Sequence, residues 1–142
     1  MGTLKRVTGF GGVFFKARDP ERLYRWYAKH LGVRRKPKEG GVTFLWRDAQ
    51  TGARGMTVWA LFPHDTTYFD PSSAPFMLNY RVHDLDGLLA ALRKAGVKIE
   101  KAEDYPYGRF AWIMDPEGNR IELWEPPKPK VKAARKKARR KK

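Results

Sequence analysis

The chain contains no cysteine, which excludes disulfides, thiolate metal sites and cysteine nucleophiles. It also lacks a long apolar run, and residues Met1 to Val7 show neither a signal-peptide pattern nor a membrane span. No Gly-x-Ser-x-Gly elbow and no P-loop is present. We therefore expect a cytoplasmic globular protein without the motifs of a serine hydrolase or a nucleoside triphosphatase.

Acidic residues are absent from Lys128 to Lys142, a stretch that holds ten of the 30 Lys and Arg. The other residues carry 20 basic and 15 acidic side chains, so the net charge of +15 falls to +5 outside this tail. Such a charge density cannot build a core, and we predict that residues 128–142 are disordered. Weak binding of nucleic acid or another polyanion is one expectation for this tail. The alternative is a solubilising tail with no partner.

The remaining residues, 1–127, form one predicted domain in which a strand–helix–strand pattern occurs twice. Asp19 and Asp84 are both predicted helix caps and lie 65 positions apart. Strands with alternating apolar residues follow each predicted helix. The repeat predicts an α+β fold of two tandem modules, residues 8–62 and 76–126, whose sheets curl around a central cavity.

The clearest local motif runs from Asp115 to Trp124, with the sequence Asp-Pro-Glu-Gly-Asn-Arg-Ile-Glu-Leu-Trp. It predicts a tight turn followed by a strand that places Glu122 on the face opposite the apolar Ile121 and Leu123. With the repeat, the segment 12–20 and the segment 79–86, this motif resembles the vicinal oxygen chelate superfamily. That superfamily includes glyoxalases, bleomycin-resistance proteins and extradiol dioxygenases.

The resemblance implies two βαβββ modules, and in metal-dependent members a divalent ion held by four positions on the first and last strands. The corresponding residues are Gly12, Trp59, Met77 and Glu122, of which only Glu122 is a suitable ligand. The three histidines, His30, His64 and His83, are expected at helix caps or on the surface. We therefore predict no metal and no cofactor, with a divalent metal at Glu122 as the alternative.

By strand alternation, the concave face is predicted to carry an apolar and aromatic lining with a few polar groups, typical of a small-ligand site. The predicted lining residues are Phe14, Lys16, Trp59, Leu61, Met77, Asn79, Arg81, Trp112, Glu122 and Trp124. A buried carboxylate needs partners, so we expect Arg81, Lys16 or Asn79 to satisfy Glu122. In the alternative interpretation, the rings fill the space and Glu122 belongs to a buried ion pair.

Three functions follow from these patterns. The first is a small-molecule-binding protein of the glyoxalase/bleomycin-resistance type that binds an organic ligand without a metal. The second is a metal-dependent lyase, isomerase or dioxygenase, in which Glu122 is the best catalytic candidate. The third is a nucleic-acid-associated protein that acts through its tail. The resemblance also leaves a homodimer open, and nothing in the sequence indicates a membrane partner.

Overall fold

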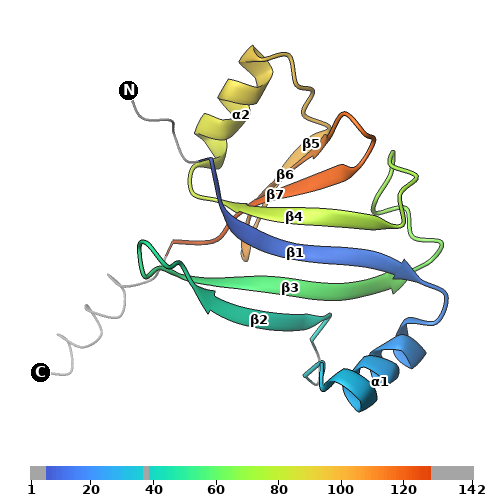
Figure 1. Ribbon diagram of the computed structural model, residues 1–142. Coiled ribbons are helices and arrows are strands. Elements are labelled where there is room, and N and C mark those ends of the chain that lie inside the picture. The colour runs from blue at the N-terminus through green and yellow to red at the C-terminus, as the bar shows by residue number, and fades with distance from the viewer. Residues whose placement is uncertain (1–5, 37–38, 129–142) are drawn as a thin grey trace, which may run out of the picture.

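The computed structural model describes residues 6–36 and 39–128 of the 142-residue chain. Its elements are β1 (Val7–Ala17), α1 (Pro20–Leu31), β2 (Val42–Arg47), β3 (Arg54–Pro63), β4 (Phe76–Val82), α2 (Leu85–Lys94), β5 (Lys101–Tyr105), β6 (Gly108–Met114) and β7 (Arg120–Glu125). The strands form one sheet in the order β2-β3-β1-β4-β7-β6-β5 (Figure 1). The predicted α+β class is confirmed. Apart from Lys128, the predicted tail lies outside the described residues.

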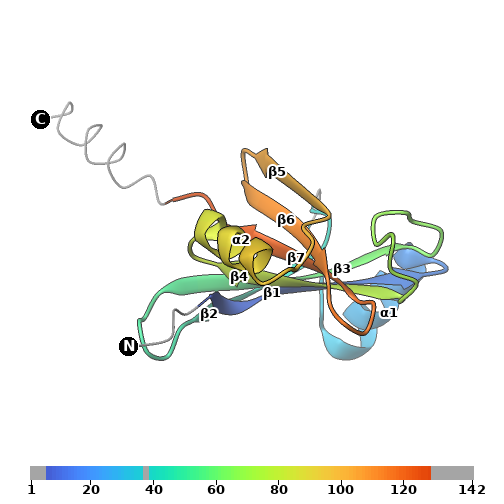
Figure 2. The same cartoon turned by 90° about the horizontal axis from the view of Figure 1, so that it is seen from above.

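The two modules meet at the centre of the sheet, where β1 and β4 run antiparallel with Phe14 opposite Met77. Within each module the first strand pairs in parallel with the last, β1 with β3 and β4 with β7. β5 and β6 turn away from the plane of the central strands, so the sheet is curled (Figure 2). The second module has three strands after its helix, but the first has two, because the described residues between α1 and β2 form no strand.

The predicted caps begin both helices. The Asp19 side chain accepts a hydrogen bond from the backbone N–H of Arg22 at 3.1 Å, and Asp84 accepts one from Gly87 at the same distance. These bonds satisfy N–H groups that have no partner within a helix. Gly32 ends α1 with φ of 70°, a left-handed conformation that suits glycine. Neither helix in the described part of the chain is long and apolar enough to cross a membrane.

Both helices cover the same, convex face of the sheet. α2 packs on an apolar cluster that includes Val82, Ala111 and Leu123, and α1 packs through Tyr24 on a cluster that includes Ala17 and Leu61. The opposite, concave face carries a third cluster made by Phe69, Met77 and Trp112, with Phe14, Phe62 and Phe110 packed against it. The concave face is therefore the one on which a site can form without competing with a helix.

Trp59 and Leu61 lie on the convex face, so their predicted place on the concave face is wrong. In the ladder between β1 and β3, Val13 is opposite Trp59 and Phe15 is opposite Leu61, and opposed residues share a face. The Trp59 ring lies 4.6 Å from the ring of Tyr27 on α1. It therefore helps to hold α1 on the sheet. The β3 residues on the concave face are Val58, Ala60 and Phe62.

Candidate functional site

The turn before β7 sets the orientation of Glu122. Asp115 accepts hydrogen bonds at 2.9 Å from the backbone N–H groups of Glu117 and Asn119. These bonds lower the pKa of Asp115, and the bond from Asn119 has the largest effect. Gly118 adopts φ of 82°, which few other residues tolerate. The closed turn starts β7 at Arg120, so that alternation directs the Glu122 side chain to the concave face.

Glu122 is only 3% exposed and its carboxylate accepts three hydrogen bonds. Asn79 Nδ2 donates to Oε1 at 2.6 Å, the Tyr68 hydroxyl donates to Oε2 at 2.6 Å, and Trp112 Nε1 donates to Oε2 at 2.9 Å. The expectation that Asn79 satisfies Glu122 is confirmed. These donors are neutral, so Glu122 is held by hydrogen bonds to uncharged groups and not by a direct ion pair.

Tyr68 reaches Glu122 from the segment between β3 and β4, residues 64–75, which lies across the concave face. The Phe62 and Tyr68 rings stack with their centres 5.4 Å apart, and Phe69 is fully buried. Ser72 Oγ donates at 2.6 Å to the carbonyl of Gly118, which ties the segment to the turn before β7. Burial and then the nearby Glu122 carboxylate raise the pKa of Tyr68, so its hydroxyl remains a donor at neutral pH.

Arg120 is a cation next to this group. Its guanidinium carbon is 5.3 Å from the centre of the Trp112 ring and 5.9 Å from that of Tyr68, and one terminal nitrogen donates to the Tyr68 carbonyl. Burial lowers the pKa of Arg120, although the negative charge of Glu122 acts in the opposite direction. The positive charge therefore sits on the rings that surround the carboxylate and does not touch it.

Two buried side-chain polar atoms in the described part of the chain lack a hydrogen-bond partner, Asn79 Oδ1 and Arg120 Nε. Both belong to residues around Glu122. Asn79 Oδ1 lies against Gly11, where an added Cβ atom would come within 2.0 Å of it. An unpaired buried acceptor or donor costs about 1–3 kcal/mol. The site therefore contains one acceptor and one donor that the protein itself does not use.

The other predicted residues divide into two groups. Phe14, Met77 and Trp112 lie together in the concave apolar cluster, as expected. Trp124 is on the same side, with its ring stacked on Phe110 at 6.4 Å and its Nε1 donating to the carbonyl of Tyr107 at 3.2 Å. These rings continue the aromatic surface from the carboxylate towards the hairpin of β5 and β6.

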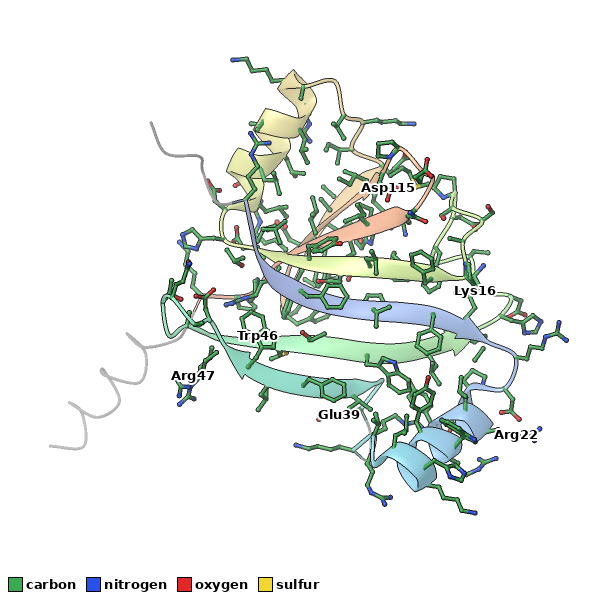
Figure 3. The ribbon with its side chains drawn as sticks, viewed as in Figure 1. Lys16, Arg22, Glu39, Trp46, Arg47 and Asp115 are labelled. Atoms are coloured by element: carbon green, nitrogen blue, oxygen red, sulfur yellow. The ribbon has the colours of Figure 1, made fainter. Side chains whose placement is uncertain are left out.

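Lys16 and Arg81, the two alternatives to Asn79, are not among the hydrogen-bond partners of Glu122. Lys16 lies at the end of β1, with its Nζ 5.7 Å from the centre of the Phe69 ring (Figure 3). Arg81 is 5.9 Å from the Trp46 ring and lines a hollow of about 420 Å³ that does not include Glu122. Their side chains instead lie against these rings.

Sequence reasoning missed Tyr68, Phe69 and Arg120. The first two belong to a connecting segment with no strand or helix periodicity, and the bond from Tyr68 to Glu122 spans 54 positions. The only local signal was an adjacent pair of rings within a polar, proline-rich connection. Strand alternation places Arg120 on the correct face. Its burial was not expected, because an arginine at the end of a strand is usually exposed.

The sheet register revises one of the four positions compared with metal-dependent relatives. Asn79 lies opposite Glu122, and Phe14, its counterpart 65 positions earlier, lies opposite Ala60. Ala60 is therefore the counterpart of Glu122, in place of Trp59. The donor set of Gly12, Ala60, Met77 and Glu122 does not fit a divalent ion, because it supplies a single oxygen ligand group. The described residues contain no group of three or more His, Cys, Asp or Glu placed to hold a metal.

Comparison with known proteins gives a family model and structural neighbours. The model of the glyoxalase-like domain matches residues 12–124. No curated protein matches the chain. The crystal structure of methylmalonyl-CoA epimerase from Mycobacterium tuberculosis is 27% identical, covers 94% of this chain and 97% of its own, and has a TM-score of 0.54.

Two further neighbours share the fold at lower identity. A variant of Streptomyces coelicolor methylmalonyl-CoA epimerase, in complex with 2-nitronate-propionyl-CoA, is 15% identical and covers 86% of this chain and 96% of its own, with a TM-score of 0.61. The crystal structure of a Legionella pneumophila NAD-dependent benzaldehyde dehydrogenase is 16% identical and covers 82% of this chain and 98% of its own, with a TM-score of 0.52. Since these neighbours are named for different reactions, the shared fold does not determine the reaction.

Proposed function

This chain belongs to the glyoxalase-like family, and on that premise we propose that it binds a small organic ligand on the concave face beside Glu122, without a metal ion. The carrying observation is the buried carboxylate with an unused acceptor, Asn79 Oδ1, and an unused donor, Arg120 Nε, in residues next to it. A ligand that satisfies either atom recovers the cost of leaving it unpaired. The surrounding rings of Trp112 and Tyr68 favour a planar ligand.

The ligand reaches Glu122 when the Tyr68 side chain rotates away from it. In the described conformation the Tyr68 hydroxyl donates a hydrogen bond to Oε2 of Glu122. The Tyr68 side chain is 39% exposed. Rotation of this one side chain opens a path from solvent to the acid. A ligand hydroxyl or N–H then takes the place of the phenol. The ligand class is therefore a planar molecule that carries at least one hydrogen-bond donor.

The absence of a metal is part of this proposal. It is supported by the single carboxylate at the four compared positions and by the three N–H and O–H donors that already occupy both oxygens of Glu122. A donor hydrogen aimed at an oxygen blocks that lone pair for a cation. Elemental analysis of the purified full chain tests it, and stoichiometric zinc, nickel or iron that a chelator removes together with ligand binding would contradict the proposal.

Tryptophan fluorescence provides the binding test, because Trp112 contacts Glu122 directly. The probes are planar aromatic compounds, each with an amide or hydroxyl donor, and each hit is measured again with Glu122→Gln. Glu117→Gln is the matched control, since Glu117 lies on the exposed surface of the turn before β7. We expect saturable quenching that weakens at least tenfold in Glu122→Gln alone. Equal affinity in all three proteins would refute the site.

An isomerase is the second candidate, favoured by the 27% identity to the Mycobacterium tuberculosis epimerase over nearly the full length of both chains. Epimerisation at a carbon next to a carbonyl removes a proton and returns one, and Glu122 is the side chain that would act as the base. The test is incubation with methylmalonyl-CoA in D₂O, with and without divalent ions. Deuterium incorporation that Glu122→Gln abolishes supports this candidate, and no incorporation in either condition rejects it.

Polyanion binding by the tail is a third proposal, supported by the ten cations and no acid in residues 128–142. Deletion of these residues should weaken binding of duplex DNA at low salt, because fewer phosphates are neutralised. Unchanged binding would reject it.

A further inference from the structure

The positive charge of residues 1–127 is concentrated in one segment. Residues 18–36 hold seven Lys or Arg and two acids, a net charge of +5, whereas the rest of residues 1–127 holds 13 of each sign and is neutral. This segment is α1 with its flanking residues. The excess of positive charge outside the tail therefore lies in this segment.

The exposed side of α1 presents this charge together with an aromatic ring. Arg22, Arg25 and Lys29 are exposed, and Arg22 points away from the sheet (Figure 3). The only salt bridge within the described part of this segment joins Arg35 to Glu21 at 2.6 Å. Trp26 is 50% exposed although it carries the largest ring in this helix. The exposed side of α1 therefore places a large ring among cations.

Trp26 is held in place and borders a hollow. Its ring lies 5.0 Å from that of His30, one helical turn on, and 5.3 Å from that of Tyr27. The hollow measures about 480 Å³ and is lined by Ala17, Arg18, Asp19, Arg22, Leu23, Trp26 and Tyr27. This volume lies within the range of small-ligand pockets, about 300–1,000 Å³. Its lining combines apolar and aromatic side chains with two arginines and one aspartate.

We propose that this surface binds single-stranded nucleic acid, with one base stacked on Trp26 in the hollow and the neighbouring phosphates on Arg18, Arg22 and Arg25. Single-strand binding combines a cationic track with an exposed ring on which an unpaired base stacks. Both features occur here, on α1 and at Arg18 just before it. In a duplex the bases are already stacked on one another, so Trp26 would contribute nothing.

The surface is separate from the candidate small-molecule site. α1 covers the convex face, whereas Glu122 is on the concave face. Lys128, the last described residue, lines a hollow together with Asp48 and Thr51 of the β2–β3 turn. α1 lies at the other end of β3, where the Tyr24 hydroxyl accepts a hydrogen bond from the backbone N–H of Leu61. Substitutions in α1 can therefore be tested in the full chain with the tail present.

The experiment is fluorescence anisotropy of a labelled oligothymidylate with the full chain, over a series of salt concentrations. Trp26→Ala should weaken binding about fivefold or more, since stacking contributes about 1–3 kcal/mol per base. Trp26→Phe should retain most of the affinity. Arg18→Gln with Arg22→Gln should reduce the slope of log K against log salt by about 1.4, the value for two phosphate contacts on a single strand.

The matched control is Arg93→Gln with Lys94→Gln, which removes two exposed charges from α2. The affinity of this variant should stay within about twofold of that of the unchanged chain, and its salt slope within about 0.3, because charges far from the contact are screened by salt. If Trp26→Ala binds as tightly as the unchanged chain, or if the α1 and α2 charge variants behave alike, the proposal is wrong. Equal loss of duplex and single-strand binding in Trp26→Ala would also overturn it. Circular dichroism of each variant confirms folding.

Discussion

Substitution of Asn79 by Asp tests the hydrogen-bond arrangement around Glu122. Asn79 Nδ2 lies 2.6 Å from Glu122 Oε1, so the variant places two carboxyl groups at that distance. Two charges 2.6 Å apart repel by about 6 kcal/mol at an effective dielectric constant of about 20. Protonation of one carboxyl removes this repulsion. Its free-energy cost is about 1.4 kcal/mol for each pH unit above the unfolded pKa of about 3.9. The cost at pH 7 is therefore limited to about 4 kcal/mol.

The sign of the pH dependence follows from the proton held in the folded state. The shared proton raises one folded pKa above its unfolded value, so the unfolded chain binds fewer protons above about pH 4, and stability falls as pH rises. We expect the destabilisation by Asn79→Asp to shrink from about 4 kcal/mol at pH 7 to about 1.5 kcal/mol at pH 5. The measurement is urea unfolding followed by circular dichroism, with the unchanged chain at each pH as the reference.

A second substitution provides the control for this reasoning. Glu122→Gln combined with Asn79→Asp exchanges donor and acceptor, so that the Gln amide donates to the new carboxylate and its oxygen still accepts from Trp112 and Tyr68. Only one carboxylate remains, and the pH dependence should disappear. A destabilisation by Asn79→Asp that is independent of pH, or a double variant that keeps the slope, would refute the arrangement.

Three further substitutions test the surroundings of the carboxylate by urea unfolding and hydrogen exchange. Tyr68→Phe removes a bond to a charged group and should cost about 1.5–3 kcal/mol, whereas Tyr107→Phe, on the exposed hairpin, should change stability by less than about 0.5 kcal/mol. Gly11→Ala places a Cβ atom 2.0 Å from Asn79 Oδ1 and should lower the free energy of unfolding by about 1–3 kcal/mol. Gly40→Ala has open space around the new Cβ atom and should not lower it. Ser72→Ala should increase hydrogen exchange in residues 64–75, because the hydrogen bond from Ser72 to the carbonyl of Gly118 is lost. Unchanged exchange would contradict this role of Ser72.

The caps and the repeat explain why most of the fold could be predicted. An aspartate before each predicted helix satisfies backbone N–H groups locally, so its effect is visible within a few residues of sequence. The repeat then requires the two modules to be related. Neither signal depends on distant contacts. The hydrogen bonds confirm the caps, and the order of elements confirms the repeat except for one strand that the first module lacks in the described residues.

The error at Trp59 has a physical cause. Both faces of β3 are covered, one by α1 and the other by the concave cluster, so both alternating sets of residues are apolar. Alternation then no longer distinguishes the faces. The assignment depended on aligning Trp59 with Glu122, and a shift of one residue moves every side chain to the opposite face. Only the pairing of Phe14 with Ala60 determines the register.

The partners of Glu122 could be predicted only in part. Asn79 follows from strand parity, since it lies opposite Glu122 on the neighbouring strand. Tyr68 comes from a connection whose path over the sheet is set by tertiary packing, such as the stacking on Phe62 and the bond from Ser72 to Gly118. Local sequence does not encode such a path, because irregular segments have no period.

The two binding proposals use opposite electrostatic solutions on opposite faces of one sheet. On the concave face a single acid is withdrawn from water and held by neutral donors, so it suits a ligand whose donors replace a phenol. On the convex face the cations of α1 stay in water, where long-range attraction to phosphates costs no desolvation. Salt should therefore weaken the second interaction strongly and the first hardly at all, since buried charges are poorly screened. The sheet between them separates the two environments, so a substitution in one surface leaves the other intact.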